Sequence, residues 1–109
     1  MTTIAFTMEG SRITGFTSSG HSDYADEGSD IVCAAVSSTI GLMECAINTV
    51  MGLAASVKID ADSASISFHL PGGLSEEIDS TCQTLLVSLM VYLASLQEEY
   101  PDNITVLEV

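Results

Sequence analysis

The chain has 109 residues, a length that suits one compact domain and is sufficient to bury a continuous core without disulfides or a structural metal. Hydrophobic residues make up 47% of the chain, which excludes an intrinsically disordered protein. The chain has 15 acidic residues but only two basic ones, Arg12 and Lys58, which gives a net charge of -13. Such a charge disfavours direct nucleic-acid binding and attracts basic partners. A simpler explanation is that the surplus carboxylates keep an apolar domain soluble.

The chain begins with a predicted β-hairpin and continues into a loop. Residues 3–8 and 13–18 are rich in β-branched and aromatic side chains, and the turn-like residues 9–12 separate them. Residues 20–30, GHSDYADEGSD, then show neither a helical nor an alternating apolar pattern, which predicts a loop. In a domain this small, function is the commonest reason for a loop of such length.

A long apolar helix is predicted over about residues 31–53, with Ser29 or Asp30 as its N-cap. This segment contains one charged residue, Glu44, and is long enough to span a membrane. Its serine, threonine and asparagine residues and the lack of flanking basic residues favour instead the buried helix of a soluble domain. No membrane association is therefore expected.

The second half of the chain predicts another hairpin, another helix and a last strand. Residues 57–59 and 64–70 flank a turn at residues 60–63. Ser75 is the expected N-cap of the second helix, and residues 104–107 have strand composition. The expected apolar face of that helix consists of Ile78, Cys82, Leu85, Leu89, Tyr92, Leu93 and Leu96.

The order ββαββαβ predicts an α+β fold in a single domain over residues 1–109, with five short strands forming a sheet packed by two long helices. Cys33, Cys45 and Cys82 are an odd number without close spacing, and the N-terminus lacks the pattern of a secretory signal, which predicts a reducing, cytoplasmic location. We expect Cys45 and Cys82 in the core and His69 on the surface.

The candidate chemistry lies in a histidine of the loop, His21, and a cysteine at the start of the helix, Cys33. If Asp30 is the N-cap, Cys33 is the third helical residue, and unpaired amides together with the helix dipole favour its thiolate. A nearby imidazole favours the thiolate further by accepting the proton, whereas the Asp30 carboxylate opposes it. The amides of Ile31, Val32 and Cys33 would also stabilise an oxyanion.

Simpler interpretations stay open for each of these residues. A free cysteine on an apolar helix is more often a core residue, a loop histidine is often merely solvated, and Asp30 is more often a cap than an orienting partner. No third ligand accompanies His21 and Cys33, so neither a metal site nor another cofactor is expected.

The order of these residues resembles a known family. Gly20-His21, a short acidic loop that contains glycine, and DIVCAAVS at residues 30–37 are similar to the Prp family of ribosomal-processing cysteine proteases, and the similarity extends over the whole chain. The resemblance implies that Cys33 is the nucleophile, His21 the general base, and Asp30 and Ser37 supporting residues. It also implies a mobile loop over the site at residues 22–29, flanked by Gly20 and containing Ser22, Asp23, Asp26, Glu27 and Gly28.

The same resemblance implies a substrate and an assembly. The substrate is the N-terminal extension of large-subunit ribosomal protein twenty-seven, cut after an aromatic pair so that the ribosome can assemble, and the enzyme is a homodimer. A basic ribosomal N-terminus would be steered by a protein of net charge -13. An aromatic cleavage site needs an apolar cleft, which we expect at the exposed edge of Ile31, Val32 and neighbouring hairpin residues.

Two other functions remain possible at this point. A non-catalytic acidic module or assembly chaperone would shield a basic ribosomal protein without cutting it, and it would keep its activity after the substitution Cys33→Ala. Redox sensing through Cys33 is weaker, because Cys45 lies twelve residues further along the same predicted helix, about 18 Å away at the helical rise of about 1.5 Å per residue.

Overall fold

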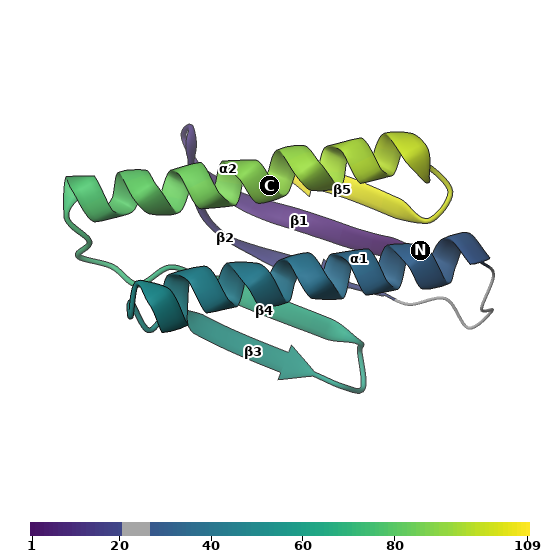
Figure 1. The fold of residues 1–109 in the computed structure, drawn as a ribbon, viewed down its shortest axis with the longest axis horizontal. Helices are drawn as coiled ribbons and strands as arrows, with labels where there is room; N and C mark the ends of the chain where they lie inside the picture. The colour runs from purple at the N-terminus through teal and green to yellow at the C-terminus, as the bar shows by residue number, and fades with distance from the viewer. Residues whose placement is uncertain (21–26) are drawn as a thin grey trace.

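The computed structural model describes residues 1–20 and 27–109. The elements are β1 (Thr2–Glu9), β2 (Arg12–Ser19), α1 (Glu27–Glu44) with its π-helical continuation η1 (Cys45–Val50), β3 (Ser56–Asp60), β4 (Ser65–His69), α2 (Glu76–Glu99) and β5 (Ile104–Glu108). The predicted α+β class and the order ββαββαβ are confirmed. Figure 1 shows α1 and α2 side by side on one face of the sheet.

The sheet has the strand order β3-β4-β2-β1-β5. Neighbouring strands are antiparallel except that β5 lies parallel to β1, which it joins after the crossover through α2. Phe6 lies opposite Phe16, and Phe16 lies opposite Phe68, so three buried rings form a row across the sheet. Their centroids are 5.8 and 5.1 Å apart, a spacing at which aromatic pairs add stability beyond simple burial.

The second helix begins as predicted. The Ser75 hydroxyl accepts a hydrogen bond from the Ile78 amide at 3.2 Å, and acidic residues occupy the first turn, where the helix dipole favours them. Of the expected apolar face, Ile78 and Tyr92 are instead 38% and 47% exposed, while Leu86 is fully buried. The buried residues recur at alternating steps of four and three: Cys82, Leu86, Leu89, Leu93 and Leu96.

The first helix differs from its prediction at both ends. It begins at Glu27 rather than near Ile31, because a helix needs no apolar side chain in its first turn, and Asp30 lies there exposed to solvent. Its π-helical end stops at Val50 rather than at about residue 53. The Asn48 amide then anchors the chain that leads to β3, because it bonds both backbone groups of Ala55 at 2.6 and 3.2 Å.

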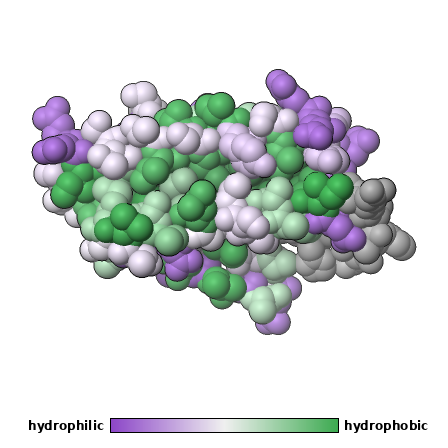
Figure 2. Space-filling model, viewed as in Figure 1, coloured by the Kyte–Doolittle hydropathy of each residue, from purple (hydrophilic) through white to green (hydrophobic). Residues whose placement is uncertain are grey.

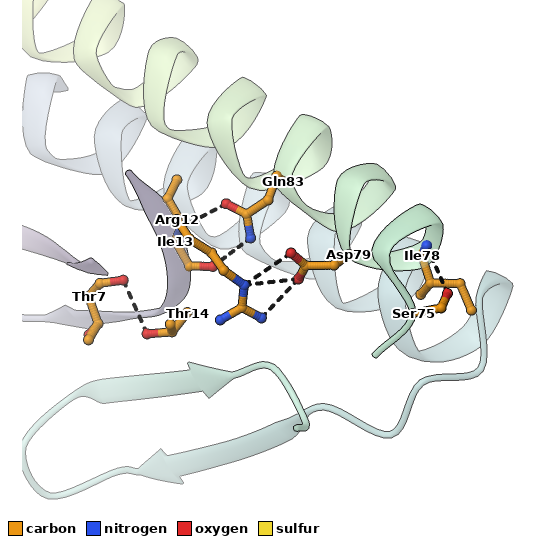
Figure 3. Close-up of polar contacts among 8 residues, drawn as sticks. All are labelled: Thr7, Arg12, Ile13, Thr14, Ser75, Ile78, Asp79 and Gln83. Atoms are coloured by element: carbon orange, nitrogen blue, oxygen red, sulfur yellow. Dashed lines mark hydrogen bonds and ion pairs between the residues drawn. The ribbon is translucent and has the colours of Figure 1, made fainter. Parts of the chain in front are cut away.

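A polar cluster ties the β1–β2 hairpin to α2 (Figure 3). The Arg12 guanidinium donates two parallel hydrogen bonds to the Asp79 carboxylate, with Nη2–Oδ1 at 2.8 Å and Nε–Oδ2 at 3.0 Å. The Gln83 side chain bonds both backbone groups of Ile13, at 2.7 and 2.8 Å. These bonds hold the start of β2 against the first turns of α2, at the opposite end of β2 from Gly20.

Both helices also show why composition alone was ambiguous about a membrane. The segments Asp30–Val50 and Glu76–Glu99 are long and apolar enough to cross one, but the core helix of a soluble protein meets the same criterion. Here each helix buries a stripe against the same sheet in a shared core. Their outward faces nevertheless carry exposed apolar side chains (Figure 2), among them Leu42 at 67% and Val91 at 61%.

Candidate active site

Cys33 lies in the second turn of α1, where its side chain is half-buried. Because α1 begins at Glu27, Asp30 is a residue of the first turn and not the N-cap that the sequence predicted. Helical bonding from residue i to i−4 pairs the amides of Ile31, Val32 and Cys33 with carbonyls of the preceding turn. The expectation that these three amides are unpaired and available to an oxyanion is therefore wrong.

Cys33 opens into a cavity of about 300 Å³. Three parts of the chain enclose it: one face of α1, the region where β1 begins and β2 ends, and the β3–β4 hairpin. Its lining from α1 is Cys33, Val36, Ser37 and Ile40; from β1, β2 and the residue after β2 it is Thr2, Ser18 and Gly20; and from the hairpin it is Ile59, Asp60, Ala61, Ala64, Ser65 and Ile66.

The walls of this cavity are mostly apolar. Val36 and Ile40 are nearly buried, whereas Ile59 is 74% exposed and therefore accessible to a ligand. A concave, mostly apolar site with a few polar groups is the usual form of a binding pocket. Of the residues expected to form the apolar cleft, Ile31 and Val32 do not line this cavity, and Val32 is buried in the core. Residues of the first hairpin do line it, among them Thr2 and Ser18.

Gly20 is required at the end of β2 for two reasons. Its φ of +91° is unfavourable for residues with a side chain, and a Cβ there would lie 2.4 Å from the Met1 carbonyl oxygen. This close approach brings the end of β2 and the start of β1 together at the cavity that Cys33 lines. His21 follows Gly20 in the sequence but lies outside the described residues, so its pairing with Cys33 stays a prediction.

The predicted mobile loop is only partly covered by the structure. Ser22, Asp23 and Asp26 lie outside the described residues. Glu27 and Gly28, which were expected in the loop, instead begin α1. Loop composition hid this helix start, because the apolar periodicity used to locate a helix becomes visible only at residue 31.

The two expected supporting residues have different positions. Ser37 lies one helical turn beyond Cys33 and lines the same cavity. Asp30 lies about one turn before Cys33, is exposed, and does not line the cavity. The structure thus brings Ser37 and Cys33 to one surface and leaves Asp30 outside the cavity lining.

The remaining cysteines and histidine do not contribute to this cavity. Cys82 is fully buried as predicted, and burial raises the pKa of its thiol. Cys45 is exposed, so its predicted core location is wrong; it lies two residues from both buried Met43 and Ile47 and therefore on the opposite side of the helix. His69 is exposed on β4 as predicted. Over residues 1–20 and 27–109, no group of three potential metal ligands is assembled.

The turn between β3 and β4 is a wall of the site that sequence reasoning missed. The Asp60 carboxylate oxygen Oδ1 accepts hydrogen bonds from the amides of Ser63 at 3.3 Å and Asp62 at 3.0 Å. Hydrogen bonding, first from Ser63 and then from Asp62, holds the pKa of the Asp60 carboxyl below its usual range. The turn itself was predicted from its composition, but nothing local in the sequence indicates that it faces Cys33.

Comparisons with known proteins agree on one family. The chain matches the family described as Cysteine protease Prp over residues 1–105. Two curated relatives named ribosomal processing cysteine protease Prp, from Bacillus subtilis and Staphylococcus aureus, are each 29% identical over 94 residues and are covered over 84% of their length; the alignments cover 86% and 85% of this chain.

Solved structures of the S. aureus protease have the same fold. One, in complex with a substrate peptide, aligns with a TM-score of 0.84 at 23% identity. Another, with a covalently linked product peptide, aligns with a TM-score of 0.77 at 25% identity. Each alignment covers 100% of both chains. With its half-buried cysteine in an apolar cavity, the chain belongs to the Prp family of cysteine proteases.

Proposed function

We propose that this cysteine protease removes the N-terminal extension of large-subunit ribosomal protein twenty-seven, with Cys33 as its nucleophile and His21 as its general base. The observation that carries the proposal is that Cys33 and Gly20, the residue directly before His21, line one cavity. The relatives from B. subtilis and S. aureus are named for ribosomal processing, and the covalently linked product peptide of the S. aureus structure is consistent with nucleophilic catalysis in that protein.

The chemistry is acyl transfer in two steps. His21 takes the proton from the Cys33 thiol, and the thiolate attacks the scissile carbonyl carbon to give a tetrahedral oxyanion. This intermediate expels the new amino terminus, which takes the proton from His21, and leaves a thioester on Cys33. Water then adds to the thioester with His21 as base, releasing the carboxylate product and restoring the thiol. No cofactor takes part in this sequence.

Two residues near the nucleophile are proposed to support it. Ser37 places a hydroxyl group on the cavity wall one turn from Cys33, where it can donate a hydrogen bond to a bound peptide. Asp30 lies exposed in the first turn of α1, about one turn before Cys33, and contributes negative charge. Since the amides of residues 31–33 are paired within α1, the oxyanion must be stabilised by other donors.

The substrate proposal rests on shape and charge. An apolar cavity beside Cys33 suits an aromatic side chain at the cleavage site. Its larger aliphatic lining residues are Val36, Ile40, Ile59 and Ile66. A net charge of -13 would attract a basic ribosomal N-terminus and would repel nucleic acid. A cytoplasmic location, where ribosomal proteins are available, belongs to the same proposal.

Mass spectrometry of the extended ribosomal protein, incubated with the wild-type chain and three variants, tests the function. We expect a single cut after the aromatic pair by the wild type and by Cys45→Ala, which removes an exposed cysteine from the first position of η1, the continuation of α1. Cys33→Ala and His21→Ala should leave the substrate intact. Cleavage by Cys33→Ala would overturn the assignment of the nucleophile.

We also propose that two copies associate through the outward face of the helices. A groove between α1 and α2 is lined by uncharged side chains, and Figure 2 shows hydrophobic groups on this face. Since each copy carries a charge of -13, an uncharged surface is where two copies approach with least repulsion. The groove residues are Thr39, Leu42, Met43, Ala46, Leu85, Ser88, Leu89 and Tyr92.

Sedimentation velocity tests this association. Leu42→Asp places a charge in the groove and should convert a dimer into a monomer, whereas Ser56→Asp places the same charge on strand β3 and should leave the dimer intact. A wild-type chain that sediments as a monomer at all concentrations would remove the proposal. Cleavage assays on both variants would then show whether the association affects the active site.

A further inference from the structure

The cavity that holds Cys33 is almost free of charge, although the chain is strongly acidic. Among the described residues that line it, Asp60 alone is ionisable apart from Cys33 itself. The ion pair found among the described residues joins Arg12 of the other hairpin to Asp79 of α2. Lys58 forms no ion pair with Asp60, although it lies two residues away on the same strand. Asp60 therefore has a carboxylate without a cationic partner in the described part of the chain, and the residue is among those that line an apolar site.

The β3–β4 turn holds this carboxylate in one orientation. Its Oδ1 accepts the amide hydrogen bonds of Asp62 and Ser63, and a carboxylate has room for further donors, because its two oxygens accept about four hydrogen bonds in all. Two other lining residues of the same turn, Ala61 and Ala64, have small side chains. The carboxylate is thus pre-oriented and accessible.

We propose that Asp60 determines substrate specificity by binding a lysine or arginine side chain of the peptide, near the apolar side chain that fills the cavity. The inference rests on the proposed peptide cleavage at Cys33 and adds a preference to it. A basic side chain suits this place because its aliphatic stem can lie along Ile59 and Ile66 while its charged end reaches Asp60. Long-range attraction by the whole protein acts on any basic peptide, whereas Asp60 would select one position in the peptide.

A peptide series separates these two effects. Each peptide carries the same aromatic pair and one lysine, which is moved through the positions on either side of the cut, and a matched peptide has norleucine in place of each lysine. We expect the wild type to favour lysine at one position by about fivefold in kcat/KM at low salt, the upper range for an exposed ion pair. The preference should weaken as salt increases.

Two matched variants identify the carboxylate responsible. Asp60→Asn keeps an Oδ1 acceptor for the turn amides but removes the charge, and it should reduce the lysine preference to about one. Asp62→Asn removes the same charge from the overall field at an exposed neighbour that does not line the cavity, and it should keep the preference. An unchanged preference in Asp60→Asn, or an equal loss in both variants, would overturn the proposal.

Binding measured without cleavage keeps this test independent of the proposed function. Fluorescence anisotropy with Cys33→Ala and the double variant Cys33→Ala, Asp60→Asn compares the lysine and norleucine peptides. A lysine preference in binding that requires Asp60, found with a wild-type chain that cuts none of the peptides, would reject the proposed reaction and support the role of Asp60. Cleavage of the peptides without a lysine preference would support the proposed reaction and reject the role of Asp60.

Discussion

The two hairpins of this protein differ in strand length, with eight residues per strand in β1–β2 and five in β3–β4, and they have opposite roles. The β1–β2 hairpin is bound to α2 by the Arg12–Asp79 ion pair and by the hydrogen bonds of Gln83. The charge of Arg12 is therefore neutralised by a partner within the fold. The β3–β4 hairpin forms one edge of the sheet, and within the described part of the chain the Asp60 carboxylate accepts hydrogen bonds only from amides of the turn that follows β3. A charge neutralised by a partner within the fold stabilises architecture, whereas one left open on a cavity wall remains available to a ligand.

The largest expected effect on stability comes from removing the Phe16 side chain, which packs against both hairpins. Phe16 lies between Phe6 of one hairpin and Phe68 of the other, and all three rings are buried. Phe16→Ala should lower the free energy of unfolding by about 3–5 kcal/mol, because it leaves a cavity and separates the stacked rings. Urea denaturation measures this loss. Thr17→Ala, at the next and only half-buried position, serves as control, and an equal loss there would contradict the central role of the row.

Two glycines of the β1–β2 hairpin, Gly10 in its turn and Gly20 directly after β2, allow a sharper comparison. Gly10 and Gly20 both have positive φ, but only at Gly20 would a Cβ collide with backbone, at 2.4 Å from the Met1 carbonyl oxygen. Gly20→Ala should displace one end of the cavity and lower kcat/KM for peptide cleavage more than tenfold, an effect of about 1.4 kcal/mol or more on the transition state. Gly10→Ala should cost about 1 kcal/mol of stability by its strained φ and leave kcat/KM unchanged. Similar kinetics for both variants would refute this difference.

The hydrogen bonds of Gln83 test whether the contact between the first hairpin and α2 contributes to stability and not to the active site. Its side chain is hydrogen-bonded to the N–H and the C=O of buried Ile13. Gln83→Ala should lower the free energy of unfolding by about 1–3 kcal/mol, since two backbone groups lose their partners. Below the unfolding transition the cleavage rate should stay unchanged. Ser80→Ala, at an exposed position one turn earlier, is the control in the same urea titration, and a selective loss of activity in Gln83→Ala would assign the contact to the active site instead.

The smallest expected effect is the pH dependence of the Arg12–Asp79 pair. Hydrogen bonding to Arg12 holds the pKa of the Asp79 carboxyl below its usual range. A carboxyl with a lowered pKa in the folded state adds stability above its unfolded pKa of about 3.9, and this is lost as the pH falls through the folded pKa. Because both side chains are partly exposed, Arg12→Ala should cost about 0.5–1 kcal/mol at neutral pH. The difference from the wild type should shrink below about pH 4 in urea titrations; a constant difference would contradict the ion pair.

Local patterns predicted most of the elements, and the errors have physical causes. The Ser75 cap and both hairpins depend on neighbouring residues, so their positions were predicted correctly. The start of α1 was predicted too late in the chain because its first turn has no apolar residue. For the same reason, the amides of residues 31–33 were wrongly expected to be unpaired. Cys45 was misplaced because an apolar composition does not tell which side of a helix faces the sheet.

The sequence by itself determined the α+β class, the order of strands and helices, and the membership of a cysteine protease family, because these follow from local periodicity and from a motif of adjacent residues. Only the tertiary structure decided which residues surround Cys33. Gly20, Ser37 and Asp60 meet at one cavity because β2 lies between β1 and β4 in the sheet and α1 packs across them. Such contacts depend on strand pairing over long sequence separations, which no local pattern encodes.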